Sequence, residues 1–216
     1  MCRNYVCEAT PDFEISIMQE DIDYERRRSE EGDKYPAAYL ETLAIYRKFC
    51  TAAADYGVIL FHASAIAVDG EAYLFSAPSG TGKSTHTSLW RKIFQDRAVM
   101  VNDDKPLLRF QEDGVYVYGT PWDGKHRLSE NLSCKLKGIC FLERGEQNSI
   151  CSLSTPQALP RIMSQTYLPK SERECQKVIG MIGKLCAQVP LYLLKCNISE
   201  EAALLSYNTM KKGLKL

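Results

Sequence analysis

Residues 77–84 read Ala-Pro-Ser-Gly-Thr-Gly-Lys-Ser, and these residue types at this spacing suit the binding of phosphate groups. The glycines at 80 and 82 allow the backbone to curl, so that successive N–H groups can point at phosphate oxygens. Lys83 adds a positive charge, and the Ser84 hydroxyl suits a magnesium ion. The residues expected to contact a nucleotide are Pro78, Ser79, Gly80, Thr81, Gly82, Lys83, Ser84 and Thr85.

The flanking elements decide between a phosphate-binding P-loop and an ordinary glycine-rich turn. The apolar run Ala72–Ser76 predicts a strand before the loop, and Lys83–Gln95 predicts a helix after it. The N-terminus of such a helix favours an anion. Although Ala77 stands where the pattern usually has glycine, this context indicates a P-loop that binds ATP or another nucleoside triphosphate with Mg²⁺.

A second group with chemical potential is Asn102-Asp103-Asp104, which follows the short apolar strand predicted over Ala98–Val101. We expect this strand to lie parallel and directly beside the P-loop strand and to carry a carboxylate toward the magnesium ion at Ser84. The second carboxylate could act as a general base toward an incoming hydroxyl. A polar turn after a buried strand is the alternative interpretation.

The three histidines differ in what their surroundings suggest. His62 ends a predicted strand, and its position alone fits a structural role at least as well as a functional one. His86 lies one turn into the P-loop helix and is expected to pack or cap. His126 lies in the polar loop 119–132, where Lys125 and Arg127 could stabilise phosphate charge and Trp122 could stack or anchor the loop. An ordinary surface loop is the alternative.

Composition limits the class of protein. The chain has 216 residues, with 27 Lys+Arg and 27 Asp+Glu, and this balance argues against nucleic acid as a partner. Nine cysteines without a C-x-x-C motif, beside only three histidines, argue against structural zinc and favour free, mostly buried thiols in a reducing cytosol. The chain contains neither an apolar run of roughly 20 residues nor a signal sequence, so we expect a cytoplasmic protein without a membrane partner.

The N-terminal part is expected to extend the core. Residues 12–18 alternate apolar and polar side chains, which predicts a half-buried strand. The charged segment 19–34 includes Arg26-Arg27-Arg28 and is read as a solvated helix or loop, with a phosphate-binding patch as the alternative. Pro36 opens a helix to about Tyr56, with an apolar stripe formed by Tyr39, Leu40, Leu43, Ala44, Tyr46 and Phe49.

The remaining elements form a mixed α/β pattern. Asp69-Gly70 and residues 111–114 predict hairpin turns, and a third strand pair is expected around 144–148. The predicted strands are 58–62, 65–68, 71–76, 98–101, 107–110, 115–118, 138–143, 149–153 and 190–195. The C-terminal helices are predicted over 155–165, 171–188 and 201–211, with Ser199 capping the last. We expect one domain over 1–216, with an N-terminal extension (1–57), a nucleotide-binding core (58–153) and a mainly helical part (154–216).

Three motifs taken in order resemble one superfamily. The set His62-Ala63-Ser64-Ala65, 77–84 and Asn102-Asp103-Asp104 is similar to the HPr serine kinase/phosphorylase catalytic domain and its relatives around phosphoenolpyruvate carboxykinase. In that kinase an H-G-x-x-V strand precedes a G-x-S-G-x-G-K-S loop, and A-D-D follows. The block 118–125 resembles small, uncharacterised kinase-like members. The similarity covers about 60–144, and alanines replace two of the kinase's glycines.

The resemblance implies a P-loop core with a mixed, hairpin-rich sheet flanked by helices. It implies Ser84 and Asp104 on the metal side, Asp103 as the base toward an acceptor hydroxyl, and His62 near the transferring phosphate. We therefore expect an ATP- and Mg²⁺-dependent phosphotransferase in which Lys83 and Arg127 stabilise charge. The acceptor would be a small protein, peptide or metabolite, and no motif specifies it or the oligomeric state. The alternative is a non-catalytic nucleotide-binding regulatory module.

Overall fold

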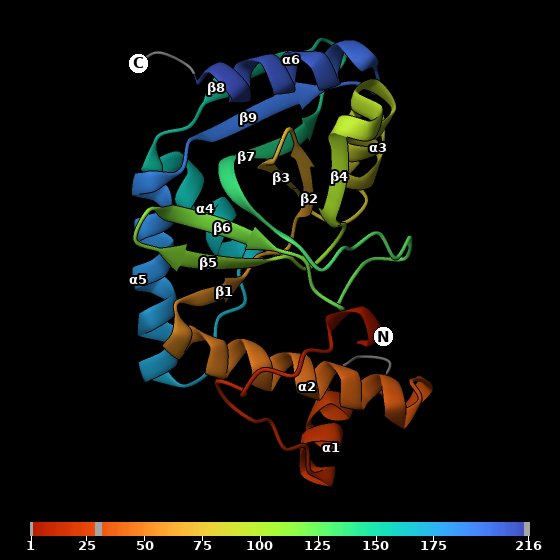
Figure 1. Cartoon of the computed structure of the whole chain (residues 1–216), viewed down its shortest axis with the longest axis vertical. Helices are drawn as coiled ribbons and strands as arrows, with labels where there is room; N and C mark the ends of the chain where they lie inside the picture. The colour runs from red at the N-terminus through yellow and green to blue at the C-terminus, as the bar shows by residue number, and fades with distance from the viewer. Residues whose placement is uncertain (1, 29–31, 214–216) are drawn as a thin grey trace.

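A curled, mixed β-sheet forms the centre of the molecule (Figure 1). The computed structural model describes residues 2–28 and 32–213. Within these residues the strand order is β1-β5-β6-β7-β3-β2-β4, with β9 paired to β7 and β8 paired to β9. The long strand β7 joins the two parts of the sheet. The strands are β1 (Val58–Leu60), β2 (Ser64–Val68), β3 (Glu71–Ser76), β4 (Ala98–Asn102), β5 (Leu107–Gln111), β6 (Gly114–Tyr118), β7 (Ser133–Arg144), β8 (Ser149–Ser152) and β9 (Leu191–Cys196).

Two of the predicted hairpins are confirmed. Asp69-Gly70 joins β2 to β3, and the turn before Gly114 joins β5 to β6; both pairs are antiparallel. Asp69 has φ 53° and Gly70 φ 82°, the left-handed conformation that a two-residue hairpin turn requires.

The position predicted for β4, directly beside the P-loop strand β3, is wrong. The hairpin places β2 against β3, so β4 adds to the outer edge of β2. Because β3 and β4 are both antiparallel to β2, they still run in the same direction. Their carboxyl ends therefore reach the same edge of the sheet, one strand further apart than the sequence suggested.

The predicted pairing of the strands 138–143 and 149–153 is also wrong. β9 lies between β7 and β8, parallel to β7 and antiparallel to β8. The apolar residues of β9, including Leu191, Tyr192 and Leu194, are buried from both faces, and a strand of that kind needs a central position. The strand predicted over 138–143 is also longer, beginning at Ser133.

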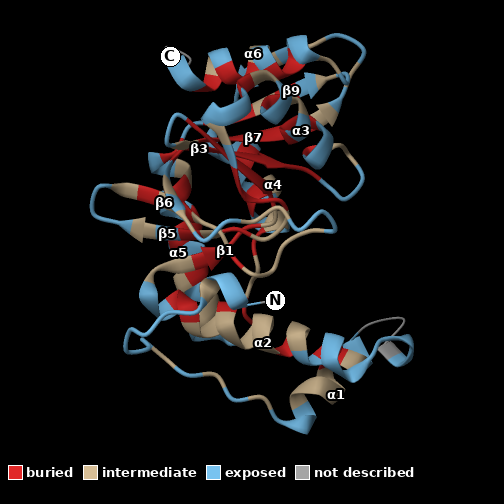
Figure 2. Cartoon of the chain, turned by 45° about the vertical axis from the view of Figure 1, so that its right-hand side comes forward, coloured by how far each residue is buried: buried red, intermediate tan, exposed pale blue. Residues whose placement is uncertain are grey.

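Two pairs of helices cover the two faces of the sheet. Helices α3 (Lys83–Phe94) and α6 (Glu200–Lys212) lie on one face, and α4 (Thr155–Gln165) and α5 (Glu172–Gln188) on the other (Figure 1). Side chains alternate between two core clusters, as period-two strands require: Tyr73 and Phe75 pack toward Trp90 of α3, whereas Ala72 and Leu74 belong with Ile162 of α4. Figure 2 shows the central strands as the most buried part of the chain. Ser199 caps α6 as predicted, since its side chain accepts from the Ala202 N–H.

The N-terminal residues pack against helix α2 (Ala37–Ala53) beneath the sheet, with α1 (Gln19–Arg28) beside it (Figure 1). The strand predicted over 12–18 is wrong, because this segment is extended but has no partner strand. It follows α2 instead: Phe13 contacts Phe49 and Tyr56, and Lys48 donates to the Ser16 carbonyl. The contact of Phe13 with α2 explains part of the alternating pattern.

Charged side chains also join the two N-terminal helices. Arg47 of α2 donates to Glu25 and Asp21 of α1. Leu40 and Ala44 of the predicted stripe are buried, whereas Tyr39 is exposed. Residues 29–31 of the charged segment lie outside the described residues. The short 3-10 helices are Arg3–Tyr5, Gly32–Lys34, Ala54–Tyr56 and Gln95–Arg97.

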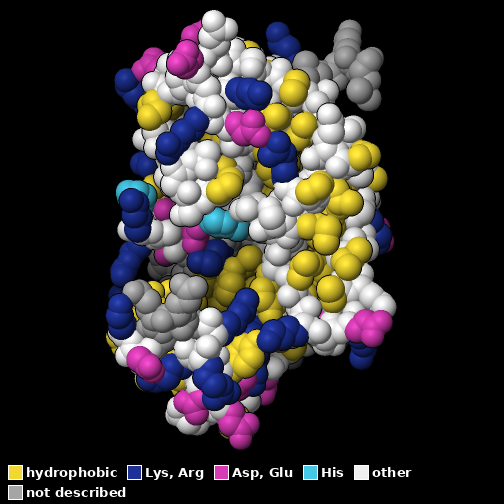
Figure 3. Space-filling view, turned by 180° about the vertical axis from the view of Figure 1, so that it is seen from behind, with side chains coloured by type: hydrophobic (Ala, Val, Ile, Leu, Met, Phe, Trp, Pro, Cys, Tyr) yellow, Lys and Arg dark blue, Asp and Glu magenta, His cyan; other side chains and the backbone are white. Residues whose placement is uncertain are grey.

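Surface features complete the description. All nine cysteines are free, but only Cys50 and Cys140 are buried, so the expectation of mostly buried thiols is wrong. Cys2, Cys7 and Cys151 are exposed. Among the described helices, none has the length and apolar character needed to cross a bilayer. The rear face is hollowed near its middle, with hydrophobic side chains in the hollow and Lys and Arg side chains around it (Figure 3).

Candidate functional site

The segment 77–84 leaves the end of β3 and enters α3 as a wide loop. Gly80 has φ 76° and Gly82 φ 126°, and a Cβ atom at either position would face open space. These conformations require glycine for backbone reasons, and the absence of neighbours leaves room over the loop. No side chain caps the start of α3. The first turn of this 12-residue helix therefore presents its N-terminus toward the same space.

Lys83 begins α3 with a largely buried side chain. Its ammonium group Nζ donates to the Ala77 carbonyl at 2.7 Å, which closes the loop on itself. Burial lowers the pKa of Lys83, and the charge of Asp104 opposes that shift. The lysine is therefore held under the loop, electrostatically coupled to a carboxylate from β4.

His62, Asp104 and Lys105 form a polar row beside the loop. His62 Nε2 lies 3.1 Å from Asp104 Oδ1, and Lys105 Nζ lies 2.6 Å from Asp104 Oδ2. Burial raises the pKa of Asp104, but hydrogen bonds from His62 and Lys105 outweigh burial and bring the pKa to about 2. His62 Nδ1 lies 2.9 Å from Gln165 Oε1. Both ring nitrogens of His62 therefore have a polar partner, Asp104 on one side and Gln165 on the other.

Backbone contacts tie this row to the loop. The Ser76 hydroxyl, at the end of β3, donates to the His62 carbonyl at 2.9 Å. The Ala63 N–H donates to the Asp104 carbonyl at 3.1 Å. The polar ends of β3 and β4 are therefore joined through the residues that precede β2.

Asn102 holds the turn that follows β4. Its Oδ1 accepts from the N–H groups of Asp104 and Lys105, at 2.8 and 2.6 Å, and its Nδ2 donates to Thr120 Oγ1 at 3.0 Å. An asparagine here can both turn the chain after β4 and anchor the loop 119–132.

Asp103 points into a different environment from Asp104. It is buried and accepts from the Gly124 N–H at 2.6 Å. Burial raises the pKa of Asp103, the Gly124 hydrogen bond opposes this shift, and the nearby charges of Asp123 and Asp104 add to it. Asp103, Ser84 and His126 line a small cavity of about 120 Å³ beside α3.

The loop 119–132 is anchored by its aromatic residue. Trp122 packs against Tyr46 and Phe49 of α2, which favours the anchoring role over stacking on a ligand. Lys125 and Arg127 are exposed, and within the described residues neither forms an ion pair with the row at His62. His86, in contrast, is buried and bonds to Ser206 of α6 at 3.0 Å, as a packing residue does.

Sequence reasoning missed two arginines and a glutamine near the loop. Arg144, the last residue of β7, donates from Nη2 to the Gly80 carbonyl at 2.7 Å, and Arg161 of α4 bonds to Glu143 at 2.8 Å. Both arginines line a cavity of about 480 Å³ together with Pro78–Thr81. A basic residue at the carboxyl end of a parallel strand was the available signal, but Arg144 was read only as part of a turn. Gln165 carried no signal, since it reaches His62 across 103 residues.

Gly119 is the point where the chain passes between two carbonyl groups. A Cβ at this position would lie 1.9 Å from the Glu130 carbonyl oxygen and 2.7 Å from that of Val101. We predict that Gly119→Ala lowers the free energy of unfolding by about 1–3 kcal/mol or more, because backbone must move. Gly180→Ala is the control: it lies in α5 with open space around it and should be neutral or stabilising by up to about 1 kcal/mol. Urea denaturation measures both, and equal effects would contradict this interpretation.

The site contains no preformed cage for a metal ion. Within the described residues, no group of three or more His, Cys, Asp or Glu side chains is arranged to hold one. Magnesium sites that use one or two carboxylates together with substrate phosphates need no such cage. The hydroxyl of Ser84 and the carboxylates of Asp103 and Asp104 are the protein groups available for that kind of site.

Comparisons with known proteins give a family match and distant similarity to solved structures. The solved structure described as the Hpr(Ser) kinase/phosphatase from Coxiella burnetii is 12% identical, with a TM-score of 0.42, over 71% of this chain and 88% of that chain. No curated protein matches this chain. The family model described as SynChlorMet cassette protein ScmC matches residues 38–202, which is more than half of the 216 residues. The chain therefore belongs to the ScmC family.

Proposed function

We propose that this ScmC-family protein is an ATP- and Mg²⁺-dependent phosphotransferase that moves the γ-phosphoryl group to a hydroxyl of a small protein, peptide or metabolite. The observation that carries the proposal is one arrangement at a single edge of the sheet. The glycine loop at the end of β3 and the aspartates at the end of β4 flank His62, and Lys83 is coupled to Asp104. Phosphoryl transfer depends mostly on positioning and charge stabilisation, and this arrangement supplies both.

In this proposal the loop residues 78–85 hold the phosphates of the nucleotide. Their backbone N–H groups and the start of α3 bind the α- and β-phosphates, and Lys83 reaches the β- and γ-phosphates once the nucleotide replaces its bond to Ala77. The Ser84 hydroxyl and Asp104 would hold the magnesium ion, which would neutralise charge between the phosphates. A pKa of about 2 keeps Asp104 ionised at any physiological pH, as a metal ligand must be.

Asp103 is the proposed general base. Its pKa is raised by burial, and a carboxylate with a raised pKa accepts a proton from a hydroxyl more readily than an ordinary aspartate. His62 would lie near the transferring phosphoryl group. Arg127 remains the candidate from the sequence for charge stabilisation, and Arg144 is a second one because it already contacts Gly80.

A non-catalytic nucleotide-binding module is the second candidate, and one observation favours it. Both Asp104 oxygens are engaged, with His62 at 3.1 Å and Lys105 at 2.6 Å. A magnesium ion would have to displace one of these partners. If the ion pairs persist in the nucleotide complex, the protein would bind nucleotide as a regulator without transferring phosphate.

Labelled phosphate separates the two functions. We predict that the purified protein binds Mg-ATP in calorimetry and transfers ³²P from γ-labelled ATP to an acceptor in an extract of the source cells, in an EDTA-sensitive reaction. Heat-treated protein is the control for kinases of the extract. Mg-ATP binding with no transfer to any acceptor would favour the regulatory module. Failure to bind nucleotide at all would contradict both candidates.

A further inference from the structure

The strand order gives a bound nucleotide a direction along the sheet edge. The order β4-β2-β3-β7-β9 places the loop 77–84 after the central strand, with His62 and Asp104 on the β2/β4 side. Ser84, the residue expected at the magnesium ion beside the β- and γ-phosphates, lines a common cavity with Asp103 on that side. The γ-phosphate end then faces β2 and β4, and the nucleoside end must leave toward β7 and β9.

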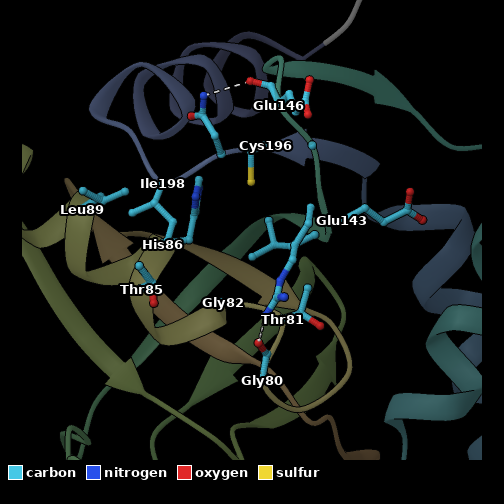
Figure 4. Close-up of a pocket in the computed structure, with 14 residues that line it drawn as sticks. Gly80, Thr81, Gly82, Thr85, His86, Leu89, Glu143, Glu146, Cys196 and Ile198 are labelled. Atoms are coloured by element: carbon cyan, nitrogen blue, oxygen red, sulfur yellow. Dashed lines mark hydrogen bonds between the residues drawn. The ribbon is translucent and has the colours of Figure 1, made fainter.

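A large cavity lies where the nucleoside end would emerge. It measures about 580 Å³ and begins at Gly80–Gly82 and Thr85, and the ends of β7 and β9 complete it (Figure 4). A volume of this size lies in the range typical of small-molecule sites, about 300–1,000 Å³. Its side walls come from three separate elements, with Leu89 on α3, Leu142 on β7 and Ile198 after β9.

The groups that face this cavity are mostly apolar or uncharged. Figure 4 shows Cys196 directed into the cavity and the carboxylates of Glu143 and Glu146 directed away from it. Glu143 is paired with Arg161 instead. The ring of His86 is held by Ser206 of α6, whose hydroxyl lies 3.0 Å from His86 Nε2. Because the side chains of Glu143 and Glu146 point away from the cavity, neither carboxylate is placed to accept hydrogen bonds from the N–H groups of guanine.

Ile198 is the most exposed large hydrophobic residue in the described chain, at 79%, and it stands at this cavity. The neighbouring backbone is held in place: the Asn197 N–H donates to Asn148 Oδ1 at 3.0 Å, and Asn197 Nδ2 donates to the Glu146 carbonyl at 3.1 Å. An anchored loop thus presents an apolar side chain to solvent next to Leu89 and an apolar cavity. If a flat ring packed against Ile198, it would remove the Ile198 side chain from water, which is favourable.

We propose that this cavity is the base-binding half of the nucleotide site, and that it takes a purine by apolar packing between Leu89 and Ile198. The proposal rests on the proposed function and adds a selectivity to it. Selection is by ring size, so ATP and GTP are accepted alike, whereas pyrimidine nucleotides and bare triphosphate bind more weakly. Without a carboxylate aimed at the ring edge, adenine and guanine are not told apart.

Calorimetry with non-hydrolysable nucleotides and inorganic tripolyphosphate, all with Mg²⁺, tests this selectivity. We expect adenine and guanine nucleotides to bind within about threefold of each other, and about tenfold or more tightly than tripolyphosphate, with cytosine and uracil nucleotides in between. ATP and tripolyphosphate binding equally well would overturn the base pocket and leave the phosphate site standing. A preference of tenfold or more between adenine and guanine would overturn selection by size. If neither ligand binds, the proposed function and the pocket both fail.

Variants identify the residue that covers the base. Ile198→Ser should weaken nucleotide binding about tenfold and leave tripolyphosphate binding unchanged, because only the base contact is lost. Leu204→Ser is the matched control, an exposed apolar residue on α6 outside the lining of the cavity, and should change neither. If Ile198→Ser binds the nucleotides as tightly as the wild type does, Ile198 does not contact the base and the proposed pocket is wrong. Ile198 is already exposed, so its replacement should not impair folding.

Discussion

Replacing Lys83 by methionine should reduce Mg-ATP affinity by about 100-fold or more and abolish phosphate transfer. The ammonium group lies beneath the glycine loop, at 2.7 Å from the Ala77 carbonyl, and is coupled to Asp104. A charge-assisted hydrogen bond to a phosphate is roughly twice as strong as a neutral one, and the contact with the β- and γ-phosphates would be lost entirely. Calorimetry with Mg-ATP, followed by a transfer assay, measures both effects.

Methionine is preferred to alanine because it keeps most of the buried stem. Lys83 is 8% exposed, and a truncation there would leave a cavity under the loop. Lys92→Met on the same helix is the control, since Lys92 is exposed and pairs with Glu200 away from the loop. It should bind Mg-ATP as the wild type does. If Lys83→Met also binds Mg-ATP normally, the loop does not hold the phosphates and the proposed function is wrong.

The second large effect is expected from Asp103→Asn, which should retain Mg-ATP binding and lower the rate of transfer by about 10²–10⁴-fold. This is the range that a general base contributes to a proton-transfer step. The asparagine can keep the hydrogen bond from the Gly124 N–H, so the loop should retain its shape. What it cannot do is take the proton of the acceptor hydroxyl. Single-turnover measurements with saturating nucleotide isolate this step from binding.

Asp104→Asn is the informative partner variant. If Asp104 lies on the metal side, this change should raise the magnesium concentration needed for half-maximal nucleotide binding, and Asp103→Asn should leave it unchanged. If Asp103→Asn rather than Asp104→Asn raises the magnesium requirement, Asp103 is the metal ligand and Asp104 the candidate base. The structure allows this outcome, because Asp103 and Ser84 line a common cavity. Asp113→Asn, in the distant β5–β6 hairpin, is the control for a lost aspartate. Wild-type transfer by Asp103→Asn would refute its assignment as base.

Local features of the fold were predictable because neighbouring residues create them. The turn at Asp69-Gly70 needs positive φ, and the Ser199 cap needs an oxygen at the start of α6; both are visible in a few letters of sequence. Glycines followed by Lys-Ser similarly predict a wide loop before a helix. The alternation over 12–18 misled because a segment that packs one face on α2 shows a similar pattern to a strand.

The pairing of strands that lie far apart in the sequence could not be predicted from neighbouring residues. β4 could pair with β3 directly or with the outer edge of β2. The short β2–β3 hairpin forms with the smallest loss of chain entropy, so β2 occupies the edge of β3 and β4 pairs with β2. The place of β9 between β7 and β8 depends on burial from both faces, which is a property of the assembled sheet.

The sequence by itself determined which chemistry this chain could carry: a loop able to wrap phosphates, a lysine at its end, and two carboxylates after an apolar strand. The tertiary structure decided how these groups meet. It bonded His62 to Asp104 and to Gln165, brought Arg144 onto Gly80, left Arg127 exposed, and opened a cavity between α3 and the ends of β7 and β9. Residue types and short spacings act through local backbone geometry. Contacts between residues far apart in the chain exist only after the hydrophobic faces of the sheet have been covered.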